Sequence, residues 1–331
     1  MEITVTIAAP SFAAKHPEIH HYTTYDGLKG IVESRTLWAT HFLHLNDATE
    51  VTLLQAPLAE TIAKRAAARM EGPQGPNRHT RRAIKRSGGL QCSARAFVRS
   101  LYGATFESTT PLAEPYITSF CTHSTDERYE IDHGLLSQWR GYGGVGGFCI
   151  VFDTAALVDL LAREYDSHYW IYMQIAQVRY ALTGFGVEEL FPHLLDRCDQ
   201  DFFEALQGGP VEIASETVSA FFEGAPLFKH QGFKEEREVR IVAIPGTQRV
   251  MEKMRIEHKD FMPSPLKAIH STDGARGPHR YLALFDDLNA QLRIKRVIVG
   301  PSQDQAKNFA RASEVLGASI ALARSDTPFI G

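Results

Sequence analysis

The C-terminal end of the chain constrains the fold more than any other segment, because it predicts a strand, a helix and a second strand in direct succession. Residues 294–299 (IKRVIV) are rich in β-branched side chains, and a proline follows soon after them. Ser302 and Gln305 have the spacing of a capping box, which predicts a helix that ends near Leu316. Residues 319–323 predict the last strand. The chain therefore ends in a βαβ-like unit, in which helices and strands share a core.

Short apolar segments predict further strands upstream. A helix should follow the first of them, because Thr24 can cap its N-terminus and apolar residues recur at the spacing of one buried face. The predicted strands are residues 19–23, 37–40, 116–121, 148–152 and 238–244. We therefore predict one α+β domain over residues 1–331, with central antiparallel and mixed sheets and flanking helices.

The positive charge is concentrated in one part of the chain. The net charge over 331 residues is only −4, yet residues 61–100 contain many Lys and Arg side chains and the single acid Glu71. Residues 71–90 combine turn-forming residues with basic ones, which predicts an exposed basic insertion in the domain. The basic side chains of residues 78–86 could contact phosphate, although a solvated loop is the simpler explanation and the one that we favour.

The composition also bears on location and on metals. No run approaches the roughly 18 apolar residues of a membrane helix, so we expect a cytoplasmic protein and no membrane partner. The acidic run near His123 and His133 has no diagnostic metal-ligand spacing, and we predict no metal site. The cysteines are too far apart for a CxxC pair and are expected to be reduced, buried thiols: Cys92, Cys121, Cys149 and Cys198.

The segment FKEEREVR, residues 233–240, is a first candidate for chemistry. Strand side chains alternate, so Glu236, Glu238 and Arg240 are expected on one face of the strand. In a cleft, Arg240 would hold a carboxylate ionised and oriented for work on a sugar or a phosphate. A solvated strand face with salt bridges is the alternative.

The segment HYTT is the second candidate. Alternation places His21 and Thr23 on one side of a strand and Tyr22 on the other. A neutral histidine and a hydroxyl suit the hydroxyls of a ribose. A core histidine is the alternative, and His20 competes for the same role, because a shift of one residue exchanges the two faces.

The segment SQWRGYGGVGG, residues 137–147, is the third candidate. Trp139 and Tyr142 offer flat stacking surfaces, Arg140 offers a cation, and the glycines allow the backbone to approach a ligand closely. The segment is neither a Walker loop nor a dinucleotide-binding fingerprint. A plain hairpin turn with a structural tryptophan is the alternative.

Together these segments resemble known families. The order of HYTT, LWATHFLHLND, ITSFCT, LLSQWRGYGGVGGFCIVFD, FKEEREVR and VIVGPSQDQ resembles a poorly characterised bacterial family with a domain of unknown function, over most of residues 19–316. The first segment also resembles the ADP-ribosyltransferase superfamily, especially its branch of nucleic-acid-modifying toxins. That resemblance implies a split-sheet fold and an enzyme that consumes NAD.

The second resemblance implies roles for individual residues. His21 would hold a ribose hydroxyl of NAD, and the backbone of Tyr22 and Thr23 would contact the nicotinamide amide. Glu238 would bind the nicotinamide ribose, and Glu236 would orient the acceptor. An aromatic residue would stack on the nicotinamide, and the candidates for it are Trp38, Trp139 and Tyr142, because a tryptophan replaces the tyrosine that is usual at position 38.

The implied reaction is loss of nicotinamide through an oxocarbenium-like transition state, stabilised by a carboxylate. The acceptor could be nucleic acid bound by residues 78–86, a protein or water, and the context a toxin or antiphage effector with a neutralising partner. Two other readings stay open. One is a nuclease in which His21, Arg140 and Glu238 act as acid, phosphate clamp and base. The other is a noncatalytic sensor of a nucleotide or a phage signal.

Overall fold

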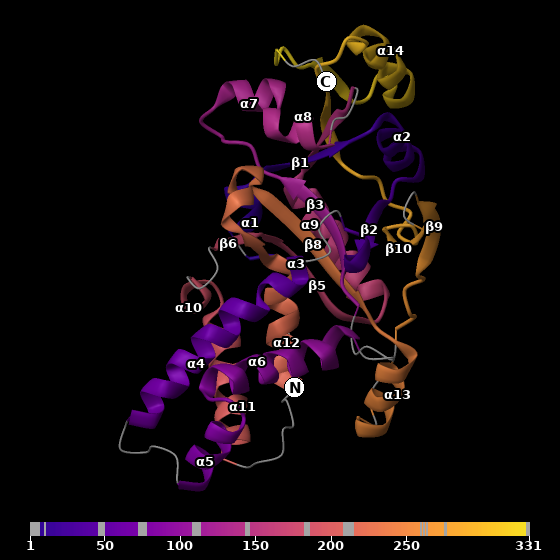
Figure 1. Ribbon diagram of the computed structural model, residues 1–331. Helices are drawn as coiled ribbons and strands as arrows, with labels where there is room; N and C mark the ends of the chain where they lie inside the picture. Colours follow the sequence, from indigo (N-terminus) through magenta and orange to yellow (C-terminus); the bar gives the residue numbers. More distant parts are fainter. Residues whose placement is uncertain are drawn as a thin grey trace. The chain divides into compact units, whose positions relative to one another are not determined.

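The structure is a computed structural model that describes residues 7–9, 11–45, 50–71, 78–107, 114–142, 146–181, 186–207, 215–258, 260, 262, 264–274 and 277–328 (Figure 1). Contacts within the chain divide it into two compact units. Unit 1 contains Met1–His44, Tyr116–Val178 and Lys234–Gly331, and unit 2 contains Leu45–Pro115 and Arg179–Phe233. This division does not test whether the two units fold as one domain. The single domain over residues 1–331 therefore stays a prediction.

Unit 1 is built on a ten-stranded sheet of the described residues. Most neighbouring strands are antiparallel, and β11 and β12 are parallel, so the sheet is mixed. Its strands are β1 (Glu18–Thr23), β2 (Leu37–His41), β3 (Tyr116–Cys121), β4 (Phe148–Asp153), β5 (Trp170–Gln177), β8 (Glu238–Pro245), β9 (His270–Gly274), β10 (Gly277–Leu284), β11 (Ile294–Val299) and β12 (Ala321–Arg324). The mixed α and β architecture that the sequence predicts is confirmed.

The sheet forks at β3. β8 pairs with β3 along the whole length of β3, from Tyr116 to Cys121. A strand has only two edges, so the other edge of β3 is shared: β1 pairs with it at Cys121, and β2 pairs with it at Tyr116 and Ile117. From this point, β1 leads to β4, β11 and β12, and β2 leads to β10 and β9.

Helices of unit 1 cover the larger apolar core on one face of this sheet. Leu28 of α2, Leu161 of α9 and Leu316 of α14 join that core, together with Ile150 and Ile241 from the strands. The helices of unit 1 are α1 (Phe12–Lys15), α2 (Tyr25–Ser34), η1 (Phe42–His44), α7 (Arg128–His133), α8 (Leu136–Tyr142), α9 (Thr154–Ser167), α13 (Gln248–Glu257) and α14 (Gln305–Leu316), and η4 (Gln231–Glu236) precedes β8.

Local sequence signals explain the borders of several elements. Thr24 caps α2, and its hydroxyl accepts a hydrogen bond from the Gly27 amide at 3.3 Å. At the C-terminal end, β11, α14 and β12 follow one another, and the two strands pair in parallel. The predicted βαβ-like unit is therefore confirmed.

Unit 2 is mainly helical. Its first two helices are α3 and α4, and Pro57 lies in the first turn of α4, where a helix tolerates proline. The elements are α3 (Glu50–Leu53), α4 (Gln55–Glu71), α5 (Arg78–Arg86), α6 (Leu90–Tyr102), η2 (Gly103–Glu107), β6 (Arg179–Ala181), α10 (Val187–Leu190), α11 (Pro192–Leu206), α12 (Ser215–Gly224), η3 (Ala225–Leu227) and β7 (Phe228–His230). β6 and β7 form a separate parallel pair.

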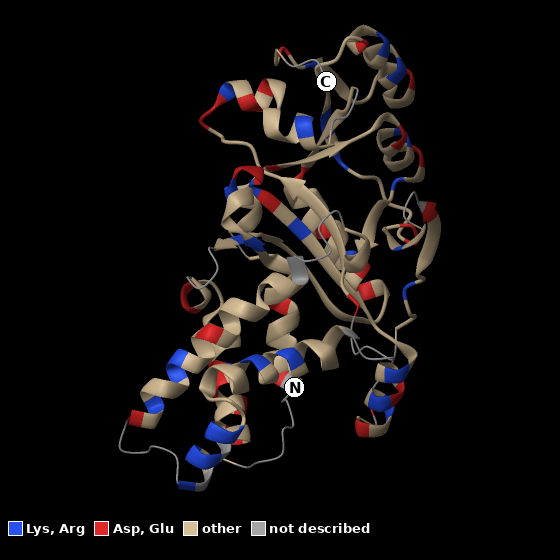
Figure 2. Cartoon of the chain, viewed as in Figure 1, with Lys and Arg blue, Asp and Glu red and all other residues tan. Residues whose placement is uncertain are grey.

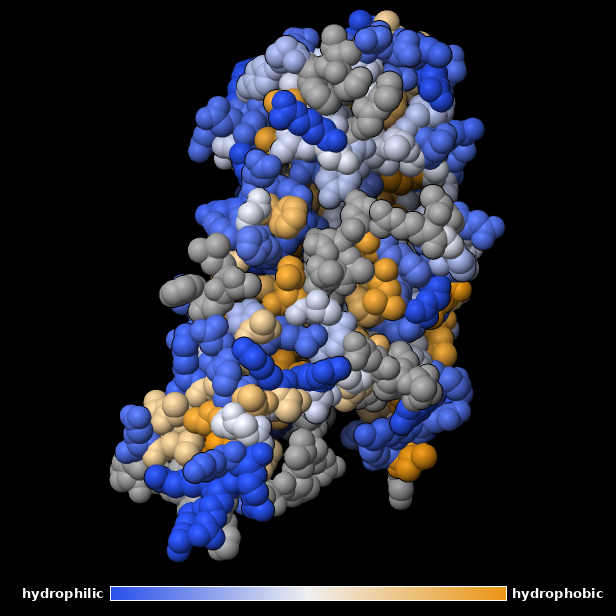
Figure 3. Space-filling view, in the orientation of Figure 1, coloured by the Kyte–Doolittle hydropathy of each residue, from blue (hydrophilic) through white to orange (hydrophobic). Residues whose placement is uncertain are grey.

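The predicted basic insertion contains a helix. Residues 72–77 lie outside the described residues, but residues 78–86 form α5, with Thr80 and Ile84 buried. Its Lys and Arg side chains are exposed; Figure 2 shows them in blue, and the surface over α5 in Figure 3 is strongly hydrophilic. The segment is therefore an amphipathic helix and not the loop that we expected.

In the part of the chain that the structure describes, no helix is both long and apolar enough to span a membrane.

Candidate functional site

One face of the forked sheet brings together side chains from β1, which contains the start of the HYTT segment, and from β8, which contains the end of the FKEEREVR segment. Residues that lie directly opposite each other on paired strands project from the same face. His20 is opposite Cys121, and Cys121 is opposite Glu238, so these three side chains form one row across β1, β3 and β8. Arg240 lies opposite Ser119 in the next row. This face, which we call the fork face, is the candidate site.

The register of β1 decides which histidine faces the site. His20 is on the fork face, whereas His21 projects from the opposite face. There the Nδ1–H of His21 donates to the carbonyl oxygen of Ser119 at 2.9 Å, and its ring lies 5.6 Å from that of Phe120. Burial lowers the pKa of His21. His20, the competing choice, therefore shares a face with Glu238, and His21 does not.

Glu238 and Arg240 form a buried ion pair. The guanidinium of Arg240 donates two hydrogen bonds to the carboxylate of Glu238, at 2.7 Å from Nε and 3.0 Å from Nη2. Both residues are almost fully buried, with exposures of 6% and 2%. A bidentate pair of this kind fixes the orientation of the carboxylate. The solvated strand face that we considered as the alternative is excluded.

Glu236 does not belong to the strand. It is the last residue of η4, and Arg237, the next residue, has a left-handed backbone with φ of 44°. The alternation of a strand does not extend through such a residue. The prediction that Glu236 shares a strand face with Glu238 was therefore wrong.

His20 stacks on His123. The ring centroids are 3.4 Å apart and the planes differ by 13°. Burial lowers the pKa of His20 well below its usual value, and the nearby His123 lowers it further. Burial lowers the pKa of His123 to about 4. Both rings are therefore neutral at pH 7, and neither ring nitrogen of His20 has a hydrogen-bond partner among the described residues.

Tyr22 connects the fork face to α8. Its hydroxyl accepts a hydrogen bond from the Leu135 amide at 2.7 Å and lies 3.0 Å from Nε2 of His123. The hydroxyl donates to Nε2 or accepts from it according to the tautomer of the His123 ring. Tyr22 is thus held by hydrogen bonds within unit 1.

The three candidates for ring stacking differ strongly in exposure. Trp139 is 1% exposed; its Nε1–H donates to the His133 carbonyl at 2.9 Å, and it packs against Tyr22 edge to face. Trp38 is 52% exposed and stacks on Tyr281, with centroids 4.0 Å apart. Tyr142, at the end of α8, is 40% exposed. Trp38 and Tyr142 thus offer ring surface to a ligand, whereas Trp139 belongs to a core.

The predicted glycine turn at residues 143–147 falls mostly outside the described residues, but α8 before it lines a pocket. Arg140 lies in this pocket together with Glu235 and Arg237, which precede β8. The segments SQWRGYGGVGG and FKEEREVR therefore meet at this pocket, and Tyr22 of the HYTT segment is hydrogen-bonded to Leu135 of its lining. Glu130 and Arg237, an ion pair in this pocket, were not predicted. Only the high charge density of residues 233–240 signalled Arg237.

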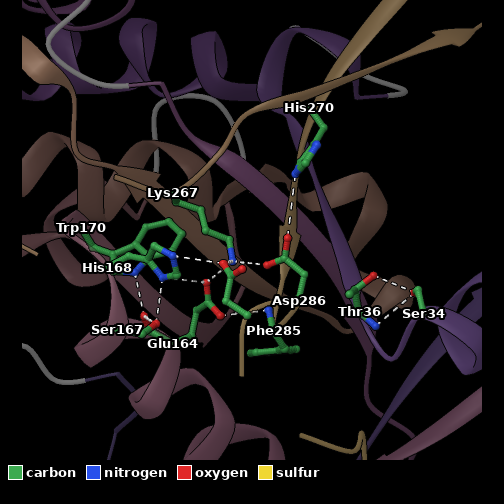
Figure 4. Close-up of polar contacts among 11 residues, drawn as sticks. Ser34, Thr36, Glu164, Ser167, His168, Trp170, Lys267, His270, Phe285 and Asp286 are labelled. Carbon is green, nitrogen blue, oxygen red and sulfur yellow. Dashed lines mark hydrogen bonds and ion pairs between the residues drawn. The ribbon is translucent and has the colours of Figure 1, made fainter. Parts of the chain in front are cut away.

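A second buried ionic cluster lies elsewhere in unit 1, and no sequence pattern predicted it (Figure 4). The amino group of Lys267 contacts Glu164 at 2.8 Å and Asp286, and both Lys267 and Glu164 have side chains without exposure. The Phe285 amide donates to Glu164 at 2.9 Å. The cluster joins the end of α9 to the end of β10, which is a structural role. Across the described residues, no group of three or more His, Cys, Asp or Glu side chains is arranged to hold a metal ion.

Comparisons with known proteins support the first resemblance and no other. Residues 138–241 match the family model described as Protein of unknown function (DUF2971). The matched range runs from α8 to β8 and includes nearly all of SQWRGYGGVGG and the whole of FKEEREVR, so the similarity to a domain of unknown function is confirmed. No curated protein and no solved structure matches the chain. The resemblance to ADP-ribosyltransferases stays a prediction.

Proposed function

We propose that this protein is a NAD-consuming enzyme of the ADP-ribosyltransferase type, with its reaction centre on the fork face. The observation that carries the proposal is the row of His20, Cys121 and Glu238 across the fork of the sheet. The sequence resemblance requires a histidine on a first strand and a glutamate on a late strand, and in this proposal His20 takes the role that the resemblance gives to His21. The division of the sheet at β3 is compatible with the split-sheet fold that the same resemblance implies.

The side chains of the fork face suit the proposed chemistry. Departure of nicotinamide leaves positive charge on the ribose, and a fixed carboxylate stabilises that charge best where water is excluded. Glu238 is buried and held by Arg240 in a bidentate pair. His20, with ring nitrogens that have no partner among the described residues, would hold a ribose hydroxyl. Trp38, from the strand on the other branch of the fork, is the proposed stacking surface for the nicotinamide.

The proposed acceptor is nucleic acid, and the basis is α5. Five exposed basic residues on this helix provide charge for phosphate contacts that do not depend on base sequence: Arg78, Arg81, Arg82, Lys85 and Arg86. A protein side chain or water is the other acceptor. An intracellular toxin or antiphage effector, with a partner that restrains it, is the biological context that belongs to this proposal.

A noncatalytic nucleotide sensor is the second candidate. The observation that favours it is the closed pair of Glu238 and Arg240, because a carboxylate already engaged by a guanidinium must exchange part of that contact before it reaches a substrate. Binding of NAD without its breakdown would support this reading.

Release of nicotinamide from NAD by the purified protein tests the proposal, with and without nucleic acid. Trp38→Ala is the most informative variant, since Trp38 is half exposed and its loss should leave the core intact. Glu238→Gln and His20→Asn address the buried row, and Glu314→Gln, an exposed carboxylate on α14, is the matched control.

We expect the wild type and the Glu314→Gln variant to release nicotinamide at equal rates. Glu238→Gln should lower the rate at least about a hundredfold, in the range of an electrostatic group lost from a transition state. Melting curves separate this result from unfolding. NAD binding without release in folded protein would favour the sensor, and neither binding nor release under any condition would refute both readings.

A further inference from the structure

We infer that the pocket between α7, α8 and the segment before β8 binds a small molecule that carries a phosphate group on a ring-containing body. The pocket lies wholly within unit 1 and has a volume of about 710 Å³, in the range of small-molecule sites. Its lining combines hydroxyl, charged and apolar groups: Tyr129, Glu130, Gly134, Leu135, Leu136, Ser137, Arg140, Gly141, Glu235, Arg237 and Thr327.

Arg237 is the principal ligand-binding group, because it is held in place before any ligand binds. Its two terminal nitrogens donate to the carboxylate of Glu130 at 2.7 Å and 2.8 Å. Its carbonyl accepts a hydrogen bond from the Thr122 amide at 3.0 Å. The backbone between these anchors is left-handed, with φ of 44°, a conformation that costs energy in a residue other than glycine. Such strain is typical of functional positions.

The pairing with Glu130 leaves Arg237 with donors to spare. A guanidinium has five N–H groups, and the contacts to Glu130 use two of them. The Arg237 side chain is 38% exposed, so the other donors are accessible at the pocket. Glu130 raises the pKa of Arg237, and Arg237 lowers that of Glu130, so both stay charged. Arg237 is thus a positioned cation, and the N–H groups that do not contact Glu130 are suited to binding a phosphate.

The lining carries two guanidiniums and two carboxylates, so the proposed phosphate is recognised by positioned N–H donors and not by net charge. Glu130 is engaged by Arg237 and by the Ser124 amide at 2.9 Å. Glu235 and Arg140 are exposed, where water screens the charge of both side chains. Arg140 contributes a second guanidinium to the lining. The N–H donors of Arg237 and Arg140 are therefore the groups that would bind a phosphate.

The rest of the pocket is suited to a ring. Tyr129 is half exposed and Leu136 more than a third exposed, so both present apolar surface. Gly134 of the lining has φ of 78°, and a Cβ there would lie 2.7 Å from the Tyr22 hydroxyl and 2.8 Å from the Trp139 ring. This part of the lining is therefore packed tightly against Tyr22 and Trp139. A mononucleotide combines the two features that this pocket would recognise.

This inference does not depend on consumption of NAD. Calorimetric titration of the full chain with AMP, adenosine and inorganic phosphate tests it, using Arg140→Gln and Arg237→Gln. Arg128→Gln is the matched control, because Arg128 lies on α7 near the pocket but is 92% exposed and not part of the lining. Arg140→Gln keeps the inference testable if loss of the Glu130 partner unfolds the Arg237 variant.

We expect AMP to bind at least about tenfold more tightly than adenosine, which is the effect of one charge-assisted hydrogen bond. Arg140→Gln should reduce that preference severalfold, folded Arg237→Gln should abolish it, and Arg128→Gln should preserve it. The inference is overturned by equal binding of AMP and adenosine, by no binding of AMP or phosphate at millimolar concentration, or by a preference that survives both pocket substitutions.

Discussion

The stacked pair of His20 and His123 predicts that unit 1 loses stability steeply as the pH falls below neutrality. Burial is the main cause of the lowered pKa of both rings, which is about 4 for His123. In the unfolded chain a histidine titrates near 6.5. Between these values the unfolded state binds a proton that the folded state does not bind. Stability is therefore complete above pH 6.5 and is lost as the pH falls toward 4.

The size of the effect follows from the same difference. Each histidine of this kind lowers the free energy of unfolding by about 1.4 kcal/mol per pH unit within that window. His123 alone accounts for a loss of about 3 kcal/mol between pH 6.5 and pH 4, and His20 adds to it. His123→Phe keeps a ring against His20 and removes one titrating group. The variant should therefore show a slope that is smaller by about 1.4 kcal/mol per pH unit.

Urea unfolding followed by tryptophan fluorescence measures this slope. The chain has three tryptophans, and all of them lie in unit 1, so the signal reports this unit alone: Trp38, Trp139 and Trp170. Titrations at pH 7, 6 and 5 on the wild type and on His123→Phe give the difference. His258→Phe is the control. It removes an exposed histidine at the C-terminal end of α13 and should leave the slope unchanged.

Equal slopes for the wild type and His123→Phe would refute the reasoning. They would mean that His123 takes up its proton in the folded state near its ordinary pKa, and hence that the stack with His20 is open to water.

Two further predictions concern other buried features of unit 1. Lys267→Met should lower the free energy of unfolding by about 3 to 5 kcal/mol in urea titrations, because it leaves the fully buried Glu164 without its cation; a loss below about 1 kcal/mol would show that water reaches the cluster. Gly134→Ala should lower the free energy of unfolding by about 1 to 3 kcal/mol and lower the melting temperature, since it adds a Cβ at a positive φ against Tyr22 and Trp139. Gly30→Ala is the control: nothing lies within 4 Å of the added Cβ, so this variant should raise the melting temperature slightly.

Local patterns were sufficient for the elements whose signals lie within a few residues. The Thr24 cap predicts α2, and the β-branched run of residues 294–299 with its following helix predicts the C-terminal unit. These signals are side-chain spacing and hydrogen bonds between residues close in sequence. They act within the segment itself and do not depend on how the rest of the chain folds.

The site depended on information that is not local. Whether His20 or His21 shares a face with Glu238 is decided by the register of β1 against β3, and alternation alone permits both choices. Glu236 was misplaced because nothing in FKEEREVR indicates that Arg237 takes a left-handed backbone. Trp139 has the aromatic ring of a stacking residue, but its burial against Tyr22 follows from tertiary packing, which the local sequence does not indicate.

The points at which the chain leaves and re-enters unit 1 are neighbours in the sheet. The end of β2 at His41 pairs with the start of β3 at Tyr116, and the end of β5 at Gln177 pairs with Val239 at the start of β8. Each excursion into unit 2 thus takes the place of a hairpin turn between two antiparallel strands. Two short turns in place of residues 45–115 and 179–233 would close the same sheet, because the residues of the fork face and of the pocket all lie in the segments of unit 1.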